Sequence, residues 1–416
     1  TQSWSSFDES FGIGHGSMSA LGVKDGIIWA ATAYTASTSV GYLPAGGGVG
    51  FSSDDGYSWT WFDQPVDSDT VTSYSPTTVN IQNVTYDLLI TSTEVWITSW
   101  AGGLRKFSFA DSVWHLVTPD TFAFSALNRY NHRAFSVVGD DSILWVGTAA
   151  GVNKSVDGGA TWQNYNHNQH GLSGNFVTAL GRQQWSSHDV LWAATWQAEG
   201  SGEYNGVTKT ENGGITWQVV LADSNYALKA HNFAFDDSIV YVASNLGLYK
   251  SVDGGQTWGI FTQIRDAQTG ELLNDPEIYS VYADDAMLWA GTGDGIASSN
   301  NYGNTWTIHR SFLPSNQAGQ PATYAYPNPF SPRRSPFVIR FQYDLPAPAE
   351  VTVRVYDFAM EEVTTVAVDQ YRSAGDHYEI WDGRRSSGDF AATGVYYYVI
   401  ERGSAASVWG KFAIIH

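Results

Sequence analysis

The stretch Ser155-Val156-Asp157-Gly158-Gly159-Ala160-Thr161-Trp162 decides the fold, because its pattern, S-x-D-x-G-x-T-W, returns along the chain. Asp or Asn in such a stretch bonds to its own turn, and Gly supplies a positive φ, so we interpret these residues as structural. The good copies comprise Ser52, Asp54, Gly56 and Trp59; Ser155, Asp157, Gly159 and Trp162; Asn212, Gly214 and Trp217; Ser251, Asp253, Gly255 and Trp258; and Asn301, Gly303 and Trp306. A degenerate copy keeps little beyond Trp114.

A strand-like segment with an aromatic residue precedes each copy. After a first gap of 67, this aromatic position recurs every 47–49 residues, at Trp29, Trp96, Trp145, Trp192, Tyr241 and Trp289. Each unit adds an upstream apolar strand and a short acidic turn such as Asp140-Asp141, which turn chemistry explains without calcium. The repeat therefore predicts an all-β fold with six four-stranded blades over about residues 10–310.

The N-terminal segment Ser3–Phe7 reads as an extra outer strand without a blade of its own. It would complete a seven-bladed β-propeller if a degenerate unit within residues 62–92 formed a blade. It would otherwise be free to pair with a neighbouring molecule, which makes Trp4 and Phe7 candidates for assembly.

The repeated turn resembles the Asp box, or BNR repeat, of sialidases, of many non-catalytic propellers and of photosystem II assembly factors. Five good copies at one period make this resemblance specific for the β-propeller fold. They imply little about activity, since Asp boxes are turns. Sialidases need three arginines on a carboxylate, and the family's N-terminal arginine motif is missing here, where the first arginine is Arg105.

The C-terminal part has a different pattern. The motifs Tyr326-Pro327-Asn328-Pro329-Phe330, Trp381-Asp382-Gly383-Arg384 and Gly394-Val395-Tyr396 resemble, in this order, the type IX secretion sorting domain and the Ig-like domain of the flagellar hook-capping protein. Strands of period two independently predict a seven-stranded sandwich. We expect a propeller over 1–314, a linker over 315–323 and an Ig-like domain over 324–416. We also expect both chain ends to be held and the sorting-type domain to be retained.

Composition narrows the classes of function. The net charge is −20, which argues against nucleic acid or anionic lipid as a partner. Cysteine is absent, so the chain has no disulfide or thiolate metal site, and we expect neither metal nor cofactor. No apolar run is long enough to span a membrane. A start at Thr1 without a leader predicts a mature secreted chain, located outside the cell or on its surface.

The long loops opposite the repeated turns are where a ligand site is expected, because extra residues in a propeller gather there. They include 33–48, 63–83, 118–133, 164–175, 196–206 and 262–278. Aromatic and polar side chains in these loops form candidates for a sugar-binding face, although packing of the loops would explain the same residues. The candidates are Tyr34, Tyr42, Trp100, Tyr130, His132, His167, His170, Trp196, Tyr204 and His231.

Three functions remain open. The first is a non-catalytic extracellular structural protein, a propeller body with an Ig-like connector, that assembles with copies of itself into a fibre or layer. The second is a glycan-binding adhesin, exported by the type IX route that the resemblance implies. The third is a glycoside hydrolase, which would need two carboxylates facing each other. No spacing singles out such a pair, so we predict no catalytic residues and no enzyme activity.

Overall fold

The computed structural model describes residues 7–67, 73, 78–198, 202–268, 270–310, 321–334 and 337–416. It contains two compact units: Thr1–Ile260 with Ser280–Ala283, and Phe261–Tyr279 with Asp284–His416. The domain bounds expected from the sequence stay a prediction, and linker residues 315–320 lie outside the described residues.

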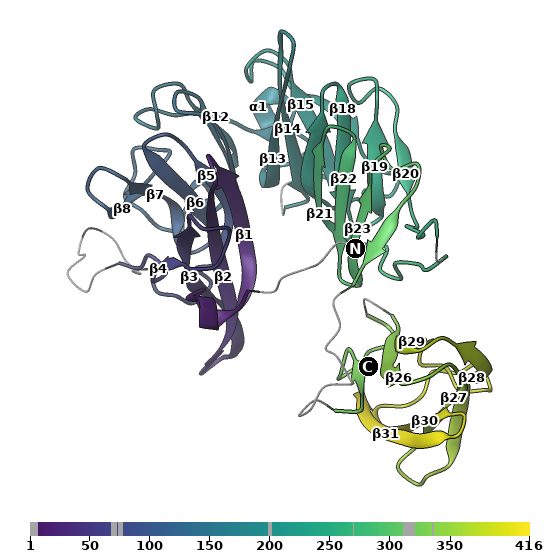
Figure 1. Ribbon diagram of the computed structural model, residues 1–416. Helices are drawn as coiled ribbons and strands as arrows, with labels where there is room; N and C mark the ends of the chain where they lie inside the picture. Colours follow the sequence, from purple (N-terminus) through teal and green to yellow (C-terminus); the bar gives the residue numbers. More distant parts are fainter. Residues whose placement is uncertain are drawn as a thin grey trace. The chain divides into compact units, whose positions relative to one another are not determined.

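Six four-stranded antiparallel sheets form the blades of a β-propeller, each with its strands in sequence order (Figure 1). Blades 1 to 3 consist of β1 (Ser17–Lys24), β2 (Ile27–Thr38), β3 (Gly41–Ser52) and β4 (Thr60–Phe62); β5 (Thr85–Ile90), β6 (Glu94–Ser99), β7 (Gly103–Ser108) and β8 (Val113–Val117); and β9 (Ala134–Gly139), β10 (Leu144–Thr148), β11 (Gly151–Ser155) and β12 (Gln163–Tyr165).

Blades 4 to 6 follow the same order. They consist of β13 (Phe176–Trp185), β14 (His188–Trp196), β15 (Gly206–Thr210) and β16 (Gln218–Leu221); β17 (Ala230–Asp236), β18 (Ile239–Ser244), β19 (Gly247–Ser251) and β20 (Gly259–Phe261); and β21 (Ile278–Asp284), β22 (Met287–Thr292), β23 (Gly295–Ser299) and β24 (Thr307–His309). Helical turns are limited to η1 (Glu9–Phe11), η2 (Tyr130–His132) and α1 (His167–His170) within the described ranges.

The core of the first unit repeats one contact between neighbouring blades. The aromatic residue of a second strand packs with an apolar residue of the next inner strand. The pairs that share a core cluster are Trp29 with Leu88, Trp96 with Val137, Trp145 with Leu180, and Trp192 with Phe233. This repetition explains why the regular spacing of these tryptophans in the sequence identifies the blades. Each of the four indole rings packs between two neighbouring sheets.

One predicted loop is a pair of strands. We expected residues 33–48 to form a loop on the ligand face, but β2 and β3 extend as a paired hairpin as far as Thr38 and Gly41. Tyr34 and Tyr42 therefore lie on strands. The aromatic and β-branched residues Tyr34, Thr35 and Thr38 favour this extension over a loop.

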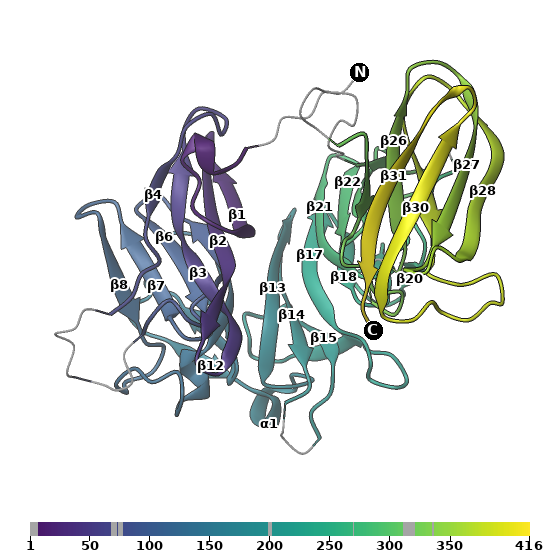
Figure 2. The same cartoon turned by 90° about the horizontal axis from the view of Figure 1, so that it is seen from below.

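The sandwich has the predicted seven strands (Figure 2). One sheet has the order β25 (Thr323–Tyr326), β26 (Ile339–Leu345) and β29 (Gly375–Trp381), and the other has β28 (Glu362–Arg372), β27 (Ala349–Tyr356), β30 (Gly394–Arg402) and β31 (Ala405–Ile414). Phe341, Tyr398 and Phe412 pack in its core. The C-terminal end is tied down, because Ile414 pairs with Phe330 and His416 Nε2 lies 2.8 Å from the Ala391 carbonyl oxygen.

Candidate functional site

A β-bulge occurs at the same place in five inner strands. Each register shift skips one residue, and the skipped residues are Ser19 in β1, Tyr86 in β5, Phe135 in β9, Thr178 in β13 and His231 in β17. A bulge bends its strand and re-aims the extra side chain, and bulges recur beside functional sites. The first unit thus presents a set of redirected side chains at one end of its inner strands.

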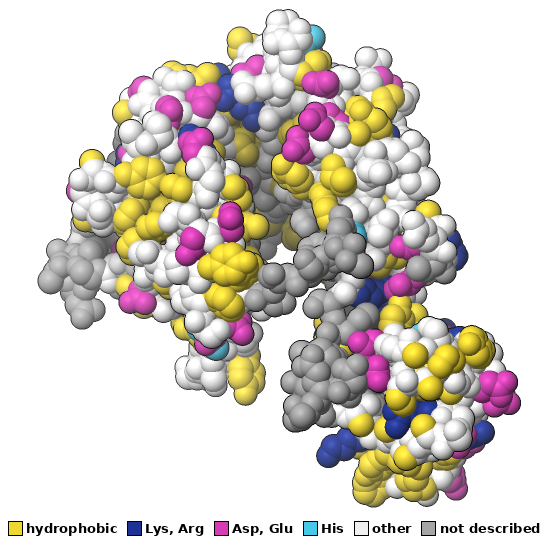
Figure 3. All heavy atoms as spheres, viewed as in Figure 1, with side chains coloured by type: hydrophobic (Ala, Val, Ile, Leu, Met, Phe, Trp, Pro, Cys, Tyr) yellow, Lys and Arg dark blue, Asp and Glu magenta, His cyan; other side chains and the backbone are white. Residues whose placement is uncertain are grey.

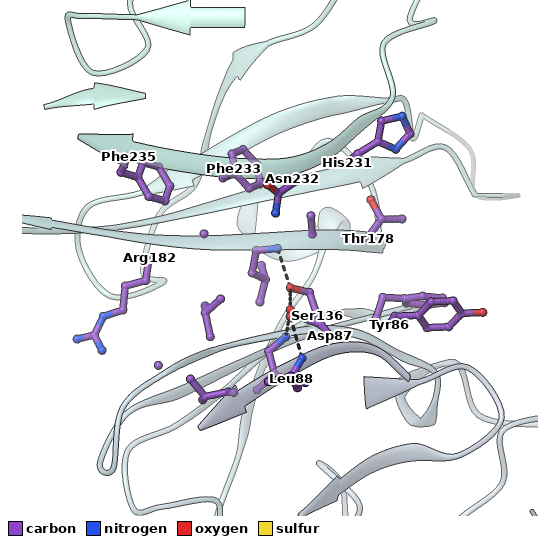
Figure 4. Close-up of a pocket in the computed structure, with 18 of the residues that line it drawn as sticks. Tyr86, Asp87, Leu88, Ser136, Thr178, Arg182, His231, Asn232, Phe233 and Phe235 are labelled. Atoms are coloured by element: carbon purple, nitrogen blue, oxygen red, sulfur yellow. Dashed lines mark hydrogen bonds between the residues drawn. The ribbon is translucent and has the colours of Figure 1, made fainter. Parts of the chain in front are cut away.

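Four of these residues line a cavity of about 500 Å³ (Figure 4). Tyr86, Thr178 and His231 lie at one end of it, while Arg182 and Phe235 lie at the other. The lining comes from β5, β9, β13 and β17, so the cavity follows the inner strands of four blades. Its volume is within the usual range for small-molecule sites.

Aromatic rings form a continuous arc at the bulge end of this cavity. Tyr86 lies 5.7 Å from Phe135, and Phe135 lies 4.7 Å from Phe176. The arc continues through Trp196, 6.3 Å from Phe176, to His231, 5.7 Å from Trp196. Tyr86 is 42 % exposed and the other four rings are half-buried. The arc therefore offers ring surface to a ligand without a fully exposed apolar patch.

Polar groups accompany the rings. The Thr178 hydroxyl oxygen is buried and has no hydrogen-bond partner among the described residues. The Lys229 ammonium lies 5.1 Å from the centre of the Trp196 ring, while the Trp196 indole N–H donates to the Ala230 carbonyl at 3.1 Å. Rings beside hydroxyl, imidazole and ammonium groups can contact both the apolar and the hydroxyl-bearing surfaces of a ligand.

Asp87 connects three inner strands through hydrogen bonds. Its carboxylate accepts hydrogen bonds from the Ser136 hydroxyl at 2.7 Å and the Val137 N–H at 2.9 Å, and the Leu180 N–H donates to the Ser136 hydroxyl at 3.0 Å. These bonds join β5, β9 and β13. Burial raises the pKa of Asp87 to about 6, because it outweighs the hydrogen bonds that favour the ionised form.

The carboxylates of the cavity are already engaged. Among its described lining residues the acids are Asp87 and Asp140, and Asp140 accepts a hydrogen bond from Arg182 at 2.6 Å. Neither carboxylate faces the cavity as one of a hydrolytic pair. Arg182 is also the one arginine of this lining, so three arginines do not converge here as sialidase chemistry would require.

Of the ten ligand-face candidates from the sequence, the structure brings Trp196 and His231 together in the arc. Tyr86, Phe135, Phe176 and Thr178 were not among the candidates predicted from the sequence. Aligned on the repeat, the bulge position reads Ser19, Tyr86, Phe135, Thr178 and His231, which share no residue type that would have marked it.

Two other candidates lie at a separate place. Trp100 and Tyr130 flank Arg133, whose guanidinium carbon lies 4.8 Å from the centre of each ring. Trp100 also lines a small apolar cavity of about 240 Å³ with residues such as Ile81 and Phe124. The arginine holds these rings against the loop, because it donates to the carbonyls of Ala126 and Leu127.

Five of the remaining candidates contact other side chains or backbone groups of this chain, and Tyr42 is largely exposed. His132 is 2 % exposed, with Asp120 on Nε2 at 2.9 Å and the Ser125 N–H on Nδ1 at 2.9 Å, so the expectation that it faces a ligand was wrong. His167 and His170 in α1 each bond to nearby backbone, at Leu172 and Asn166. Tyr204 packs on Tyr226, Tyr34 packs on His15, and Tyr42 is 78 % exposed on β3.

The repeated turns make the contacts expected of turn chemistry. Asp157 accepts from the Thr161 N–H at 2.9 Å and the Thr161 hydroxyl at 2.6 Å, and these bonds lower the pKa of Asp157 to about 2. Asn212 likewise accepts from the Thr216 N–H at 3.0 Å, but its side-chain N–H donates to the Thr216 hydroxyl at 2.8 Å. A Cβ on Gly159 would lie 2.5 Å from the Trp96 ring of the preceding blade, so only glycine fits there.

The assembly candidates are only partly described. Trp4 lies outside the described residues. The Phe7 ring packs edge-on against Phe11 at 5.2 Å and Tyr57 at 5.6 Å, and it lies against Gly56 of the first repeated turn. Phe7 thus contacts blade 1 of its own chain.

Two further features of the described structure concern metal ions and membranes. No group of three or more His, Asp or Glu residues that could hold a metal ion occurs within the described ranges. No helix there is long and apolar enough to cross a membrane.

The chain is similar to known proteins in two regions. Residues 336–406 match the family model of the FlgD Ig-like domain. No curated protein sequence matches the chain. Among solved structures, the GH74 enzyme of Niastella koreensis is 14 % identical with a TM-score of 0.51, covering 96 % of this chain and 72 % of that one.

Two further structures come from surface or extracellular proteins. The extracellular domain of the putative hybrid two-component system BT3049 of B. thetaiotaomicron is 11 % identical with a TM-score of 0.51, covering 99 % of this chain and 56 % of that one. PorZ, an essential bacterial surface component of the type IX secretion system of Porphyromonas gingivalis, is 16 % identical with a TM-score of 0.42, covering 96 % and 59 %. At these identities the likeness concerns the fold.

The chain spans 59 % of PorZ and 56 % of the BT3049 domain, so it corresponds to part of these longer proteins. The four-stranded sheets and the matched C-terminal segment lead to one conclusion. The chain is a β-propeller followed by a C-terminal Ig-like domain, in which residues 336–406 are similar to the FlgD Ig-like domain.

Proposed function

We propose that this chain is a secreted, non-catalytic carbohydrate-binding protein, and that the bulge-lined cavity of the propeller holds the sugar. The observation that carries the proposal is the arc from Tyr86 to His231 at the mouth of a 500 Å³ cavity. Sugars have apolar C–H faces that stack on aromatic rings, and hydroxyls that form hydrogen bonds with polar groups beside those rings.

The absence of a facing carboxylate pair in the cavity favours binding over hydrolysis. Asp87 serves the contact between strands, and Asp140 serves Arg182. A retaining or inverting hydrolase would need an acid and a second carboxylate on opposite sides of one bond. Incubation of the protein with the bound glycan should therefore leave the chain length of the glycan unchanged.

A glycan array tests the proposal. We expect the wild type to bind neutral oligosaccharides, and Tyr86→Ala to weaken that binding at least tenfold because it removes the most exposed ring of the arc. Tyr42→Ala is the matched control, since Tyr42 is 78 % exposed and outside the arc. An array without any bound glycan, or equal binding by Tyr86→Ala, would refute the proposal.

The structural role in a fibre or layer stays a separate prediction. This prediction rested on the ends of the chain. Trp4 lies outside the described residues, and Phe7 packs against blade 1 of the same chain. Sedimentation of the purified protein tests it directly: a monomer at micromolar concentration contradicts self-assembly, and it leaves carbohydrate binding unaffected.

A further inference from the structure

The outer face of one sandwich sheet is aromatic where polar residues would be usual. Strand register places Tyr356 opposite Tyr397, and Val399 opposite Trp409. Their neighbours Val355, Tyr398 and Ile400 belong to the core, so these four side chains point away from it. Antiparallel sheets with one solvated face normally place polar side chains there.

The rings on this face form two pairs. Tyr356 and Trp409 lie 5.8 Å apart with ring planes 31° from parallel, and Phe358 and Tyr397 lie 6.4 Å apart at 35°. Since Tyr356 and Tyr397 are neighbours across β27 and β30, the four rings make a continuous strip, here called the outer strip. Val399 points outward yet is only 4 % exposed.

The outer strip nevertheless leaves much ring surface in solvent. Phe358 is 77 % exposed and Trp409 is 53 % exposed, with Met360 and Val395 exposed nearby. The space-filling view shows hydrophobic side chains gathered at the lower end of the sandwich (Figure 3). A contiguous exposed apolar patch on a soluble protein marks a binding surface.

The charged groups on this face indicate which kind of partner it can bind. Arg354, on the same face, is neutralised by Glu401 at 2.6 Å and by Glu362 at 3.9 Å. Lys411 lies on the same face, opposite Tyr397, so the rings lie beside two cations and two glutamates, Glu362 and Glu401, whose formal charges balance. The whole chain carries −20, which repels polyanions and further copies of the chain. A neutral partner with flat apolar faces suits both facts.

We infer that the outer strip binds a neutral polysaccharide, whose sugar rings stack on Trp409, Tyr356, Tyr397 and Phe358. This site is separate from the propeller cavity and uses none of its residues. Two carbohydrate sites on one chain would raise its avidity for a polymer beyond the affinity of either site.

Native affinity electrophoresis of the full chain tests this inference, with hydroxyethyl cellulose, xyloglucan or laminarin in the gel. We expect at least one of these neutral polymers to retard the wild type. The double variant Phe358→Ala/Trp409→Ala should lose at least tenfold in apparent affinity. Both side chains are largely exposed, so the variant should keep the wild-type melting temperature.

Two controls separate this site from the others. Tyr371→Ala removes a ring that is 69 % exposed on β28 of the same sheet and should change nothing. Tyr86→Ala should weaken binding on the glycan array at least tenfold but leave part of the retardation in the gel. Equal retardation of the double variant and the wild type overturns the inference, as does a wild type that no neutral polymer retards. Loss of self-association in the double variant without a change in retardation also overturns it, since that result would assign the strip to a protein contact.

Discussion

Asp294 and Arg340 form a buried ion pair within the second unit, in which the two side chains are only 1 % and 3 % exposed. Asp294 lies in the turn between β22 and β23 of blade 6, and Arg340 lies on β26 of the sandwich. The Arg340 guanidinium donates to Asp294 at 2.8 Å, and Arg310 reaches the same carboxylate at 3.1 Å. Arg310 also pairs with Glu271. The last blade and the sandwich thus share a network with two cations and two anions.

Removing Arg340 should be costly. Arg340→Ala leaves Asp294 buried with one partner fewer, and we expect a loss of about 3–5 kcal/mol in the free energy of unfolding of the second unit. Chemical denaturation measures this loss. Arg384→Ala is the control, because Arg384 pairs with Asp382 at the surface and such pairs contribute about 0–1 kcal/mol. Similar losses in the two variants would contradict the buried pair.

The two glycines of one repeated turn should respond differently to alanine. Gly158 and Gly159 both have positive φ, at 66° and 87°. A Cβ on Gly158 meets only the Asp141 carbonyl at 3.6 Å, so Gly158→Ala should cost about 1–2 kcal/mol of backbone strain. Gly159→Ala adds a clash with Trp96 and should cost about 1–3 kcal/mol more. Denaturant midpoints of the two variants measure the difference, and equal midpoints would argue against the packing of this turn on the preceding blade.

A buried leucine of β5 and an exposed leucine of the loop before β9 should respond differently to alanine. Leu88 is 7 % exposed and shares a core cluster with Trp29, whereas Leu127 is 53 % exposed. Leu88→Ala should therefore cost about 2–5 kcal/mol, from lost burial and a cavity. Leu127→Ala should change stability by less than about 0.5 kcal/mol. Unfolding in urea checks both, and similar losses in the two variants would contradict the packing of Leu88 between blades 1 and 2.

Ionisation of Asp87 should lower the stability of the first unit as the pH rises from about 4 to about 6. The folded pKa of Asp87, about 6, is higher than the ordinary value of 3.8. Between these values the folded state binds more protons than the unfolded state, so ionisation of Asp87 opposes folding as the pH rises from about 4 to 7. Asp87→Asn removes this contribution. The difference in unfolding free energy between wild type and variant should change by roughly 1–3 kcal/mol across this range. If the two curves stay parallel, the raised pKa is wrong.

The repeat in the sequence predicts the blades because a large aromatic residue marks the second strand of each one, and the repeated turn follows it in all but the second blade. Trp96 and Trp162 show this: both are visible as motif residues, and they meet at 6.4 Å between neighbouring blades. The seven strands of the sandwich were predicted for a similar reason, since their side chains alternate with period two.

The candidate site was harder to predict, because a bulge shifts strand pairing by one residue, and a single interruption within a short alternating pattern does not identify it in the sequence. Tyr86 and Phe135 lie within strands, and ligand-face residues were sought in loops. His132 shows the opposite case. A histidine in a loop was expected to face solvent, but hydrogen bonds with Asp120 and Ser125 hold His132 in the interior. Long-range contacts decide both cases, and a local pattern carries no information about them.

Isothermal titration with the glycan that binds most tightly on the array can show whether the aromatic arc holds the sugar. The proteins compared are the wild type, Tyr86→Ala and the control Tyr42→Ala. We expect saturable binding at one propeller site, at least tenfold weaker in Tyr86→Ala and unchanged in Tyr42→Ala, with the glycan recovered intact. Binding that is the same in all three proteins, or a glycan recovered in shortened form, would contradict it.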